Sequence, residues 1–249
     1  DGLSPLKAKV RTLLNYGRDL QHRSFEMFHA TFEDLRCWAW HYIRKQPDTT
    51  LTQWYKNAVQ VRGGDLRITI PATTAAGPSL QKTQLKKLKK PISECSVAAS
   101  GQPGFDVLLP MGNTMVLCEC RYTEPPDRER SSNKISPAED VRRKTVLAEG
   151  EVKASKATIQ SGEITAKASA FVLVAHRATG RLEGFAELCS KRPQGEKALA
   201  DWHSFMKTEM AVIVLDRDAL LCFYGPTFSA LGGFMLEYNK RHFSCEQRK

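Results

Sequence analysis

Two acidic residues stand at the outer ends of a short apolar hairpin within residues 104–121. The segment reads Gly-Phe-Asp-Val-Leu-Leu-Pro-Met-Gly-Asn-Thr-Met-Val-Leu-Cys-Glu-Cys-Arg, which predicts two strands joined by a Pro/Gly/Asn turn. With residues 110–113 as the loop, Asp106 pairs across the hairpin with Leu117, and Glu119 becomes its diagonal neighbour. Diagonal neighbours lie roughly 7–8 Å apart, a gap that one divalent cation with its waters can bridge. The hairpin therefore predicts a site for a divalent metal ion.

The alternation of side chains along the two strands predicts which residues share a face with the carboxylates. That face holds Asp106, Leu108, Met115, Leu117, Glu119 and Arg121. Residues 114–120 are apolar on both faces, as expected of a central strand covered on both sides. A carboxylate at the buried end of such a strand needs a metal ion or another partner. The alternative is a hairpin with ordinary charged ends, in which Glu119 pairs with Arg121 or with a neighbour.

The composition narrows the classes of protein and of partner. The 249 residues have a formal net charge of +10, and the positive field favours nucleic acid as the partner. No apolar run approaches ~18 residues, so we expect no membrane span. The seven cysteines lack C-x-x-C spacing, which predicts free thiols in an intracellular, reducing compartment. The chain begins without Met, so we expect a longer parent protein with further domains; a homodimer is also compatible with the sequence.

The elements that must position the hairpin follow from hydrophobic periodicity. An amphipathic helix is expected over residues 17–45, with an apolar stripe of Phe25, Phe28, Phe32, Leu35, Ala39 and Tyr42. A short helix within residues 50–60 and a strand within 62–70 should follow it. Beyond the hairpin, Ser136-Pro137-Ala138-Glu139 predicts a helix start. That helix should run to about residue 161 and expose three basic residues near its start: Arg142, Arg143 and Lys144.

The remaining segments complete one α/β domain over residues 1–249. Buried strands are expected at 170–175 and 210–215, with a helix at 198–206 between them and another at 218–223. Residues 71–92 form a basic, linker-like insertion, and residues 123–135 are expected to be a mobile loop. The insertion contains a run of lysines that could contact phosphates or simply be solvated: Lys86, Lys87, Lys89 and Lys90. The predicted fold is a mixed central sheet with helices on both faces.

The order helix-strand-strand-strand-helix-strand, with the acids in these places, resembles the PD-(D/E)XK superfamily of restriction-endonuclease-like nucleases and its αβββαβ core. Residues 104–121 are most similar to the nuclease-type domains of Crinkler effectors and of trypanosomal retrotransposon-hot-spot proteins. Residues 212–226 are similar to those domains as well. The resemblance spans about residues 20–225, and its specific motif covers some 18 residues.

This resemblance implies roles for individual residues. Asp106 matches the first metal-binding acid, and Glu119 matches the acid of the (D/E)XK triplet. Glu26 in the first helix matches a further acidic member of the site, with Glu33 as the alternative. The resemblance also implies an endonuclease that hydrolyses DNA phosphodiester bonds with Mg²⁺ or Mn²⁺, and an effector acting in the nucleus.

Arg121 stands where the triplet of this superfamily has lysine. A guanidinium group stays protonated, so Arg121 cannot act as a general base, although it can orient water and neutralise charge on a phosphate. A lysine of the following helix, such as Lys144 or Lys156, could take the missing role. If none does, the expected function is that of a catalytically inactive nuclease-fold module that binds nucleic acid or a protein partner. A ribonucleoprotein subunit is a third hypothesis, which rests on the basic loops alone.

Overall fold

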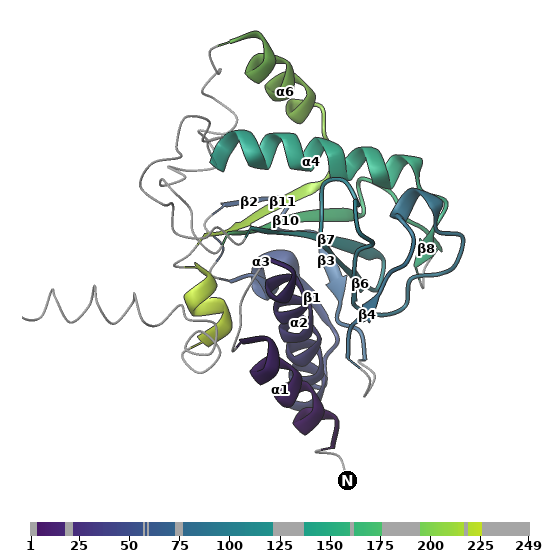
Figure 1. Ribbon diagram of the computed structural model, residues 1–249, viewed down its shortest axis with the longest axis vertical. Coiled ribbons are helices and arrows are strands. Elements are labelled where there is room, and N and C mark those ends of the chain that lie inside the picture. The colour runs from purple at the N-terminus through teal and green to yellow at the C-terminus, as the bar shows by residue number, and fades with distance from the viewer. Residues whose placement is uncertain are drawn as a thin grey trace, which may run out of the picture.

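A seven-stranded sheet with helices on both faces forms the centre of the computed structural model (Figure 1). The structure describes residues 4–17, 22–56, 58, 60–72, 77–121, 137–159, 162–175, 195–216 and 219–225. In spatial order, the strands of the sheet are β2 (Gln60–Arg62), β11 (Ala211–Leu215), β10 (Ser169–Ala175), β7 (Thr114–Arg121), β6 (Val107–Met111), β5 (Ser96–Val97) and β4 (Ser79–Leu80). The fold class predicted from the sequence, a mixed α/β sheet covered on both faces, is confirmed.

The sheet combines a parallel half with an antiparallel half. β7, β10 and β11 run parallel to one another, whereas β5, β6 and β7 form an antiparallel meander. Edge strand β2 pairs antiparallel with β11, and edge strand β4 pairs parallel with β5. Two short antiparallel pairs lie outside this sheet: β1 (Asp48–Thr50) with β3 (Arg67–Thr69), and β8 (Thr158–Ile159) with β9 (Gly162–Glu163). Strand β7 is therefore the place where the two halves meet.

Helices lie in two layers, one on each face of the sheet (Figure 1). One layer holds α1 (Ser4–Gly17), α2 (His22–Arg44) and the short α3 (Leu51–Trp54), together with residues 219–225, which are helical. The other holds α4 (Pro137–Ala154) and α6 (Glu196–Met206). Within the described residues, no helix is both long and apolar enough to span a membrane.

The strands separate two hydrophobic cores by the alternation of their side chains. Cys118 and Cys120 of β7 point into the core under α2, which also holds Phe25 and Phe28. Leu117 and its neighbours on the other face pack against α4 and α6, as do Leu108 and Met115. The predicted division of the hairpin into two faces is therefore confirmed for these residues, and so is the buried stripe of α2 at Phe25, Phe28, Phe32 and Leu35.

The hairpin register differs from the predicted one by two residues. Leu108, and not Asp106, pairs with Leu117, and the turn consists of Gly112 and Asn113 alone. Gly112 has φ +64°, and a Cβ atom there would lie 2.6 Å from the Cβ of Thr69. A tight turn with glycine at its first central position needs positive φ there, so Gly112 permits the short turn that the prediction of a four-residue loop missed.

Other predicted elements are found with shifted boundaries. The helix expected to end near residue 161 ends at Ala154, because the chain turns into β8 and β9. Helix α1 was not predicted. Part of the segment expected to be a linker is folded, since it contains β4 and a 3₁₀ turn, η1 (Leu85–Lys87). Residues 73–76 and the expected mobile loop at 123–135 lie outside the described residues.

Candidate active site

Asp106 lies immediately before β6, where the hairpin ladder ends beside the carboxyl end of β7. Its backbone N–H donates to the carbonyl of Cys118 (2.7 Å), and the N–H of Cys120 donates to its Oδ2 atom (2.7 Å). The shorter turn shifts the register by two residues, which brings Asp106 closer to Glu119 than the predicted register would. The carboxyl group of Asp106 is thus anchored on the backbone of β7, next to the second predicted acid.

Glu119 is buried, with 3% of its surface exposed, and its charge is met by two cations. Lys144 Nζ lies 2.7 Å from Glu119 Oε1, and Arg121 Nε lies 3.3 Å from the same oxygen. Lys144 belongs to α4, which crosses the sheet face to which Glu119 points. The expectation that a carboxylate here needs a partner is met by these side chains.

Arg121 is held mainly by an acid that the sequence analysis did not single out. Its Nε and Nη2 atoms donate to Asp140 Oδ2 (2.8 Å) and Oδ1 (2.9 Å) of α4. Burial disfavours the charged form of Arg121, but the bond to Asp140 and the charges of Glu119 and Asp140 raise its pKa above the ordinary value. Arg121 is therefore a permanent cation that joins β7 to α4. The signal for Asp140 in the sequence is its position four residues before Lys144, on the same helix face.

Asp106 lies in a field of negative charge. Burial, followed by the negative charges of Glu119 and Glu26, raises the pKa of Asp106 to about 8. The hydrogen bond from Cys120 and the charge of Lys144 act in the opposite direction without cancelling these effects. The raised pKa therefore favours the protonated form of the Asp106 carboxyl group at neutral pH.

The structure distinguishes between the two glutamates proposed in α2. Glu26 is close enough for its charge to act on Asp106. Glu33 is fully buried elsewhere in the core, where it accepts hydrogen bonds from Tyr55 Oη (2.8 Å) and Trp54 Nε1 (3.2 Å) and lies 3.5 Å from Arg36. Desolvation raises the pKa of Glu33. Glu33 thus belongs to a structural network, and Glu26 is the glutamate of α2 beside the site.

The residues expected to contact nucleic acid have different environments. Lys144 lies in the site itself. Arg142 was expected to be exposed, but it is buried with 4% of its surface accessible, because α4 turns this residue toward the protein. Arg143 remains partly exposed and lies 3.4 Å from Asp140. All four lysines of the run are exposed: Lys86, Lys87, Lys89 and Lys90.

The donor set near Asp106 consists of carboxylate oxygens. Among the described residues, no three His, Cys, Asp or Glu side chains are arranged as a metal-binding group. Mg²⁺ is held in many enzymes by only one or two carboxylates and completes its octahedron with water. The pair Asp106 and Glu119 fits that chemistry, because a cation between two neighbouring acids would offset the repulsion between their charges.

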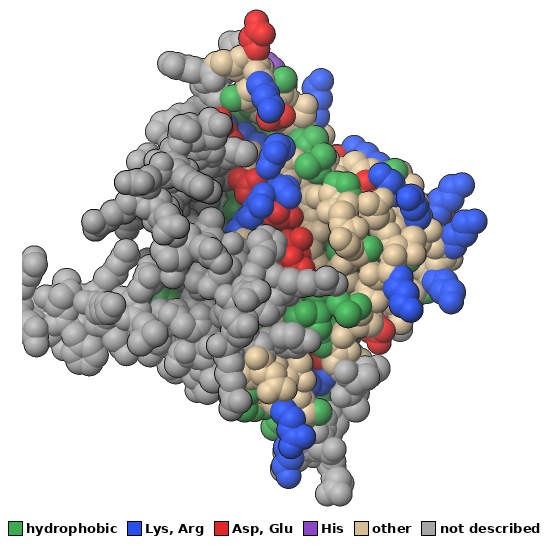
Figure 2. Space-filling view, in the orientation of Figure 1, with side chains coloured by type: hydrophobic (Ala, Val, Ile, Leu, Met, Phe, Trp, Pro, Cys, Tyr) green, Lys and Arg blue, Asp and Glu red, His purple; other side chains and the backbone are tan. Residues whose placement is uncertain are grey.

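The surface around the site mixes both signs of charge. In Figure 2, acidic side chains gather in the middle of the visible face, with Lys and Arg side chains beside them below α4. More Lys and Arg side chains stand at the edge of the molecule on the side of β8. A polyanion approaching this face would thus meet cations on both sides of the acids.

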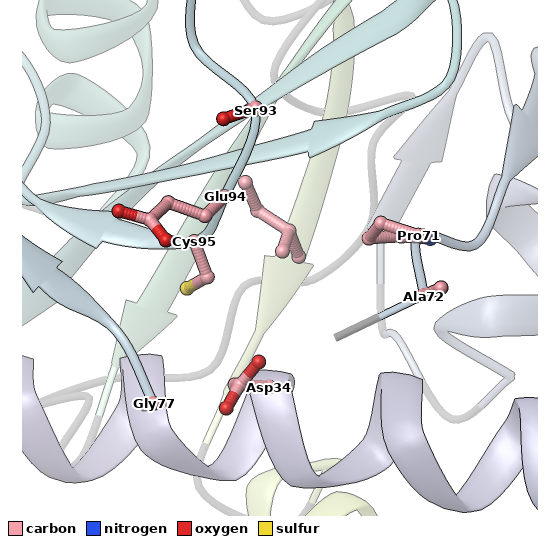
Figure 3. Close-up of a pocket in the computed structure, with 8 residues that line it drawn as sticks. Asp34, Pro71, Ala72, Gly77, Ser93, Glu94 and Cys95 are labelled. Atoms are coloured by element: carbon pink, nitrogen blue, oxygen red, sulfur yellow. The ribbon is translucent and has the colours of Figure 1, made fainter. Parts of the chain in front are cut away.

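A second group of acidic side chains lines a cavity between α2 and β5, but this cavity is too small to be a substrate site. Its cavity of about 20 Å³ is lined by Asp34, Glu94 and Cys95 among others (Figure 3). Such a volume holds about one water molecule. Asp34 is also already engaged by Lys9 of α1, so this cavity offers no free carboxylate pair.

Comparison of the chain with protein-family models, with curated proteins and with solved structures gave no match.

Proposed function

We propose that this protein hydrolyses phosphodiester bonds of DNA as a metal-dependent endonuclease with Asp106, Glu119 and Lys144 at its centre. The observation that supports this most is the meeting of three ionisable side chains from separate elements. Asp106 precedes β6, Glu119 lies near the carboxyl end of β7, and Lys144 of α4 lies 2.7 Å from Glu119. Two acids can hold a metal ion for such a hydrolysis, and an adjacent lysine can stabilise the charge that develops on the phosphate.

The arrangement of elements also supports the proposal. Helix α2 covers one face of a meander of β5, β6 and β7, and α4 then leads to β10, which runs parallel to β7. This order agrees with the αβββαβ core implied by the resemblance to PD-(D/E)XK nucleases. In the proposal, Lys144 takes the role of the triplet lysine, because Arg121 is engaged with Asp140.

The proposed chemistry divides the work among these residues. Asp106 and Glu119 hold Mg²⁺ or Mn²⁺, which when bound lowers the pKa of a water and screens the scissile phosphate. Asp106 releases its proton when it becomes a ligand. Lys144, freed in part from Glu119, orients the attacking water or neutralises the charge that develops on the phosphate. Glu26 stands beside Asp106 as an additional acid.

Localisation in the nucleus also belongs to the proposal, and it is supported only by the resemblance to the nuclease-type domains.

A second candidate function is that of an inactive nuclease-fold module that binds nucleic acid or a protein partner. It is favoured by the two cations that already neutralise Glu119, since Lys144 and Arg121 satisfy this carboxylate without a metal ion. The same charge distribution would then serve binding only.

Plasmid nicking separates the two functions. The wild-type protein should nick supercoiled DNA with Mg²⁺ or Mn²⁺ and be inert in EDTA. Asp106→Asn and Glu119→Gln should each abolish nicking, because each removes a negatively charged ligand while keeping its shape. The matched controls Asp65→Asn and Glu163→Gln, at exposed positions, should nick normally. A wild-type protein that cuts neither DNA nor RNA with either metal would exclude the enzyme and leave the binding module.

A further inference from the structure

The run of four lysines is part of the folded structure and is not a flexible tether. We call Lys86, Lys87, Lys89 and Lys90 the lysine ridge. Leu85, at the start of the ridge, is buried with 1% exposure against the core under α4. Its carbonyl accepts a hydrogen bond from Ser155 Oγ (3.3 Å), just beyond the end of α4. The ridge is thus fixed to the carboxyl-terminal end of that helix.

Polar contacts connect the ridge to the segment that leads into Asp106. Glu151 of α4 lies 3.2 Å from Lys86 Nζ and accepts from Gln102 Nε2 (3.0 Å). Gln102 Oε1 in turn accepts from the N–H of Leu85 (2.7 Å). Gln102 precedes Asp106 by four residues, so these contacts set the position of the ridge relative to the site.

The segment between Gln102 and Asp106 is itself fixed on α4. Gly104 has φ +85°, and a Cβ atom there would lie 2.7 Å from the N atom of Ala148. Phe105 is fully buried in the same core. The backbone therefore lies directly against α4, with no freedom for the ridge to drift away from Asp106.

Along α4, the residue that contacts the ridge, Glu151, lies about two helical turns beyond Lys144. Lys144 and Glu151 are seven residues apart in α4, which corresponds to roughly 10 Å along the helix axis. Double-stranded DNA rises about 3.4 Å per base pair, so the offset is about three base pairs. Lys87, Lys89 and Lys90 are exposed and form no ion pair within the described part of the chain. Their charges are available to a polyanion.

We propose that the lysine ridge and the site at Lys144 contact the same DNA duplex, about three base pairs apart, so that the ridge holds the duplex on one side of the site. This inference rests on the proposed function, since it names the substrate surface of that site. Nucleic acid is favoured over an anionic membrane because the ridge is rigidly offset from the site along one helix, and because both signs of charge lie together on the face shown in Figure 2.

The test measures DNA binding in EDTA, so that it does not depend on catalysis. Affinity for a 16-base-pair duplex is measured against salt concentration for four proteins. These are the wild type, a ridge variant with all four lysines changed to Gln, Lys144→Gln, and a control variant with four exposed lysines changed to Gln: Lys7, Lys56, Lys197 and Lys207.

The ridge variant should flatten the slope of log affinity against log salt by roughly two to four, at about 0.9 per lost phosphate contact. Lys144→Gln should flatten it by roughly one, and the control variant by less than the ridge variant.

Three outcomes would overturn the inference. The first is an equal slope in the ridge variant and the control variant. The second is a ridge effect without any effect of Lys144→Gln, which would mean that the two places do not contact one duplex. The third is binding to phosphatidylserine vesicles that depends on the ridge, with no such dependence for DNA. Ridge-dependent binding together with an absence of nicking would instead refute the proposed enzyme and leave this surface intact.

Discussion

Lys144 and Arg121 both bring positive charge to Glu119, but their bonding differs. Lys144 approaches a single oxygen of Glu119, whereas Arg121 donates from both Nε and Nη2 to the two oxygens of Asp140. A bidentate guanidinium pair has a fixed geometry and is not reproduced by an ammonium group. Arg121 therefore acts on the site by fixing the first turns of α4, and Lys144, four residues beyond Asp140, receives its position from that contact.

Substitutions of these two cations should have different effects on nicking. Lys144→Met should lower the rate by roughly 10²-fold or more, since one positioned charge at a reacting group contributes on that order. Arg121→Lys should lower it by about tenfold, because it loses one of two hydrogen bonds to Asp140, at roughly 1.5–3 kcal/mol for a charged bond. Single-turnover rates at saturating metal provide the measurement. Full activity in Lys144→Met would show that another group supplies this charge.

The pKa of Asp106 predicts how stability depends on pH. The carboxyl group binds its proton with a pKa of about 8 in the folded protein and near 3.8 when unfolded. Between these values the folded state binds more protons, so its stability falls as pH rises. The contribution is fully present below about pH 4 and is lost as pH approaches 8, with a slope of up to about 1.4 kcal/mol per pH unit.

Urea unfolding in EDTA, at pH 5 and at pH 7, tests this expectation. Asp106→Asn cannot titrate, so the difference in unfolding free energy between wild type and variant should shift by roughly 2–3 kcal/mol over those two units. Asp65→Asn, at an exposed position, should show no such shift. A constant difference between wild type and Asp106→Asn would contradict a raised pKa for Asp106.

At the scale of elements, local patterns predicted most helices and strands, and contacts distant in sequence decided the rest. The stripe of α2 is visible in the sequence because apolar residues recur at a helical period. Strands β7, β10 and β11 are visible because each is a short continuous run of apolar residues. The register of the hairpin depended on Gly112 fitting against Thr69, some forty residues earlier. The pair Arg121 and Asp140 also joins separate elements, so their contact could not be predicted from the sequence around either residue.

Helix α1 shows why an element can escape prediction and still be firmly attached. Its residue Lys9 forms an ion pair with Asp34 of α2, and both side chains are almost fully buried. Burial raises the pKa of Asp34, and the hydrogen bond and charge of Lys9 oppose that shift. A lysine in a helix usually indicates a solvated face, so this contact could not be expected from the sequence.

Breaking that ion pair should loosen α1 from α2. Lys9→Met should lower the unfolding free energy by about 3–5 kcal/mol, because it leaves the carboxylate of Asp34 buried without its cation. The double variant Lys9→Met with Asp34→Leu should recover most of the loss. Lys7→Met, on the exposed side of the same helix, is the control and should change stability little. A double variant as unstable as the single one would show that the helix depends on other contacts.

At the scale of the whole molecule, the site lies where the parallel and antiparallel halves of the sheet meet at β7. Asp106, Glu119 and Lys144 come from three elements, and the two helical layers bring Glu26 and Lys144 to the same carboxylates from opposite faces. The sequence indicated both acids through the hairpin, and it named Lys144 as one of two candidate lysines. The choice between Lys144 and Lys156 required the fold, since only the crossing of α4 over β7 decides which lysine reaches Glu119.

This convergence of acids predicts that a divalent cation stabilises the whole protein. A ligand that binds only the folded state at 100 times its dissociation constant adds about 2.7 kcal/mol. For a chain of this size, each kcal/mol raises Tm by roughly 2–4 °C, so saturating Mg²⁺ or Mn²⁺ should raise Tm by roughly 5–10 °C over EDTA.

The rise in Tm should be larger at pH 8 than at pH 6, because the ion must displace the proton from Asp106. Asp106→Asn should remove the rise, and Glu163→Gln should keep it. An equal rise in Asp106→Asn would place the cation elsewhere in the protein.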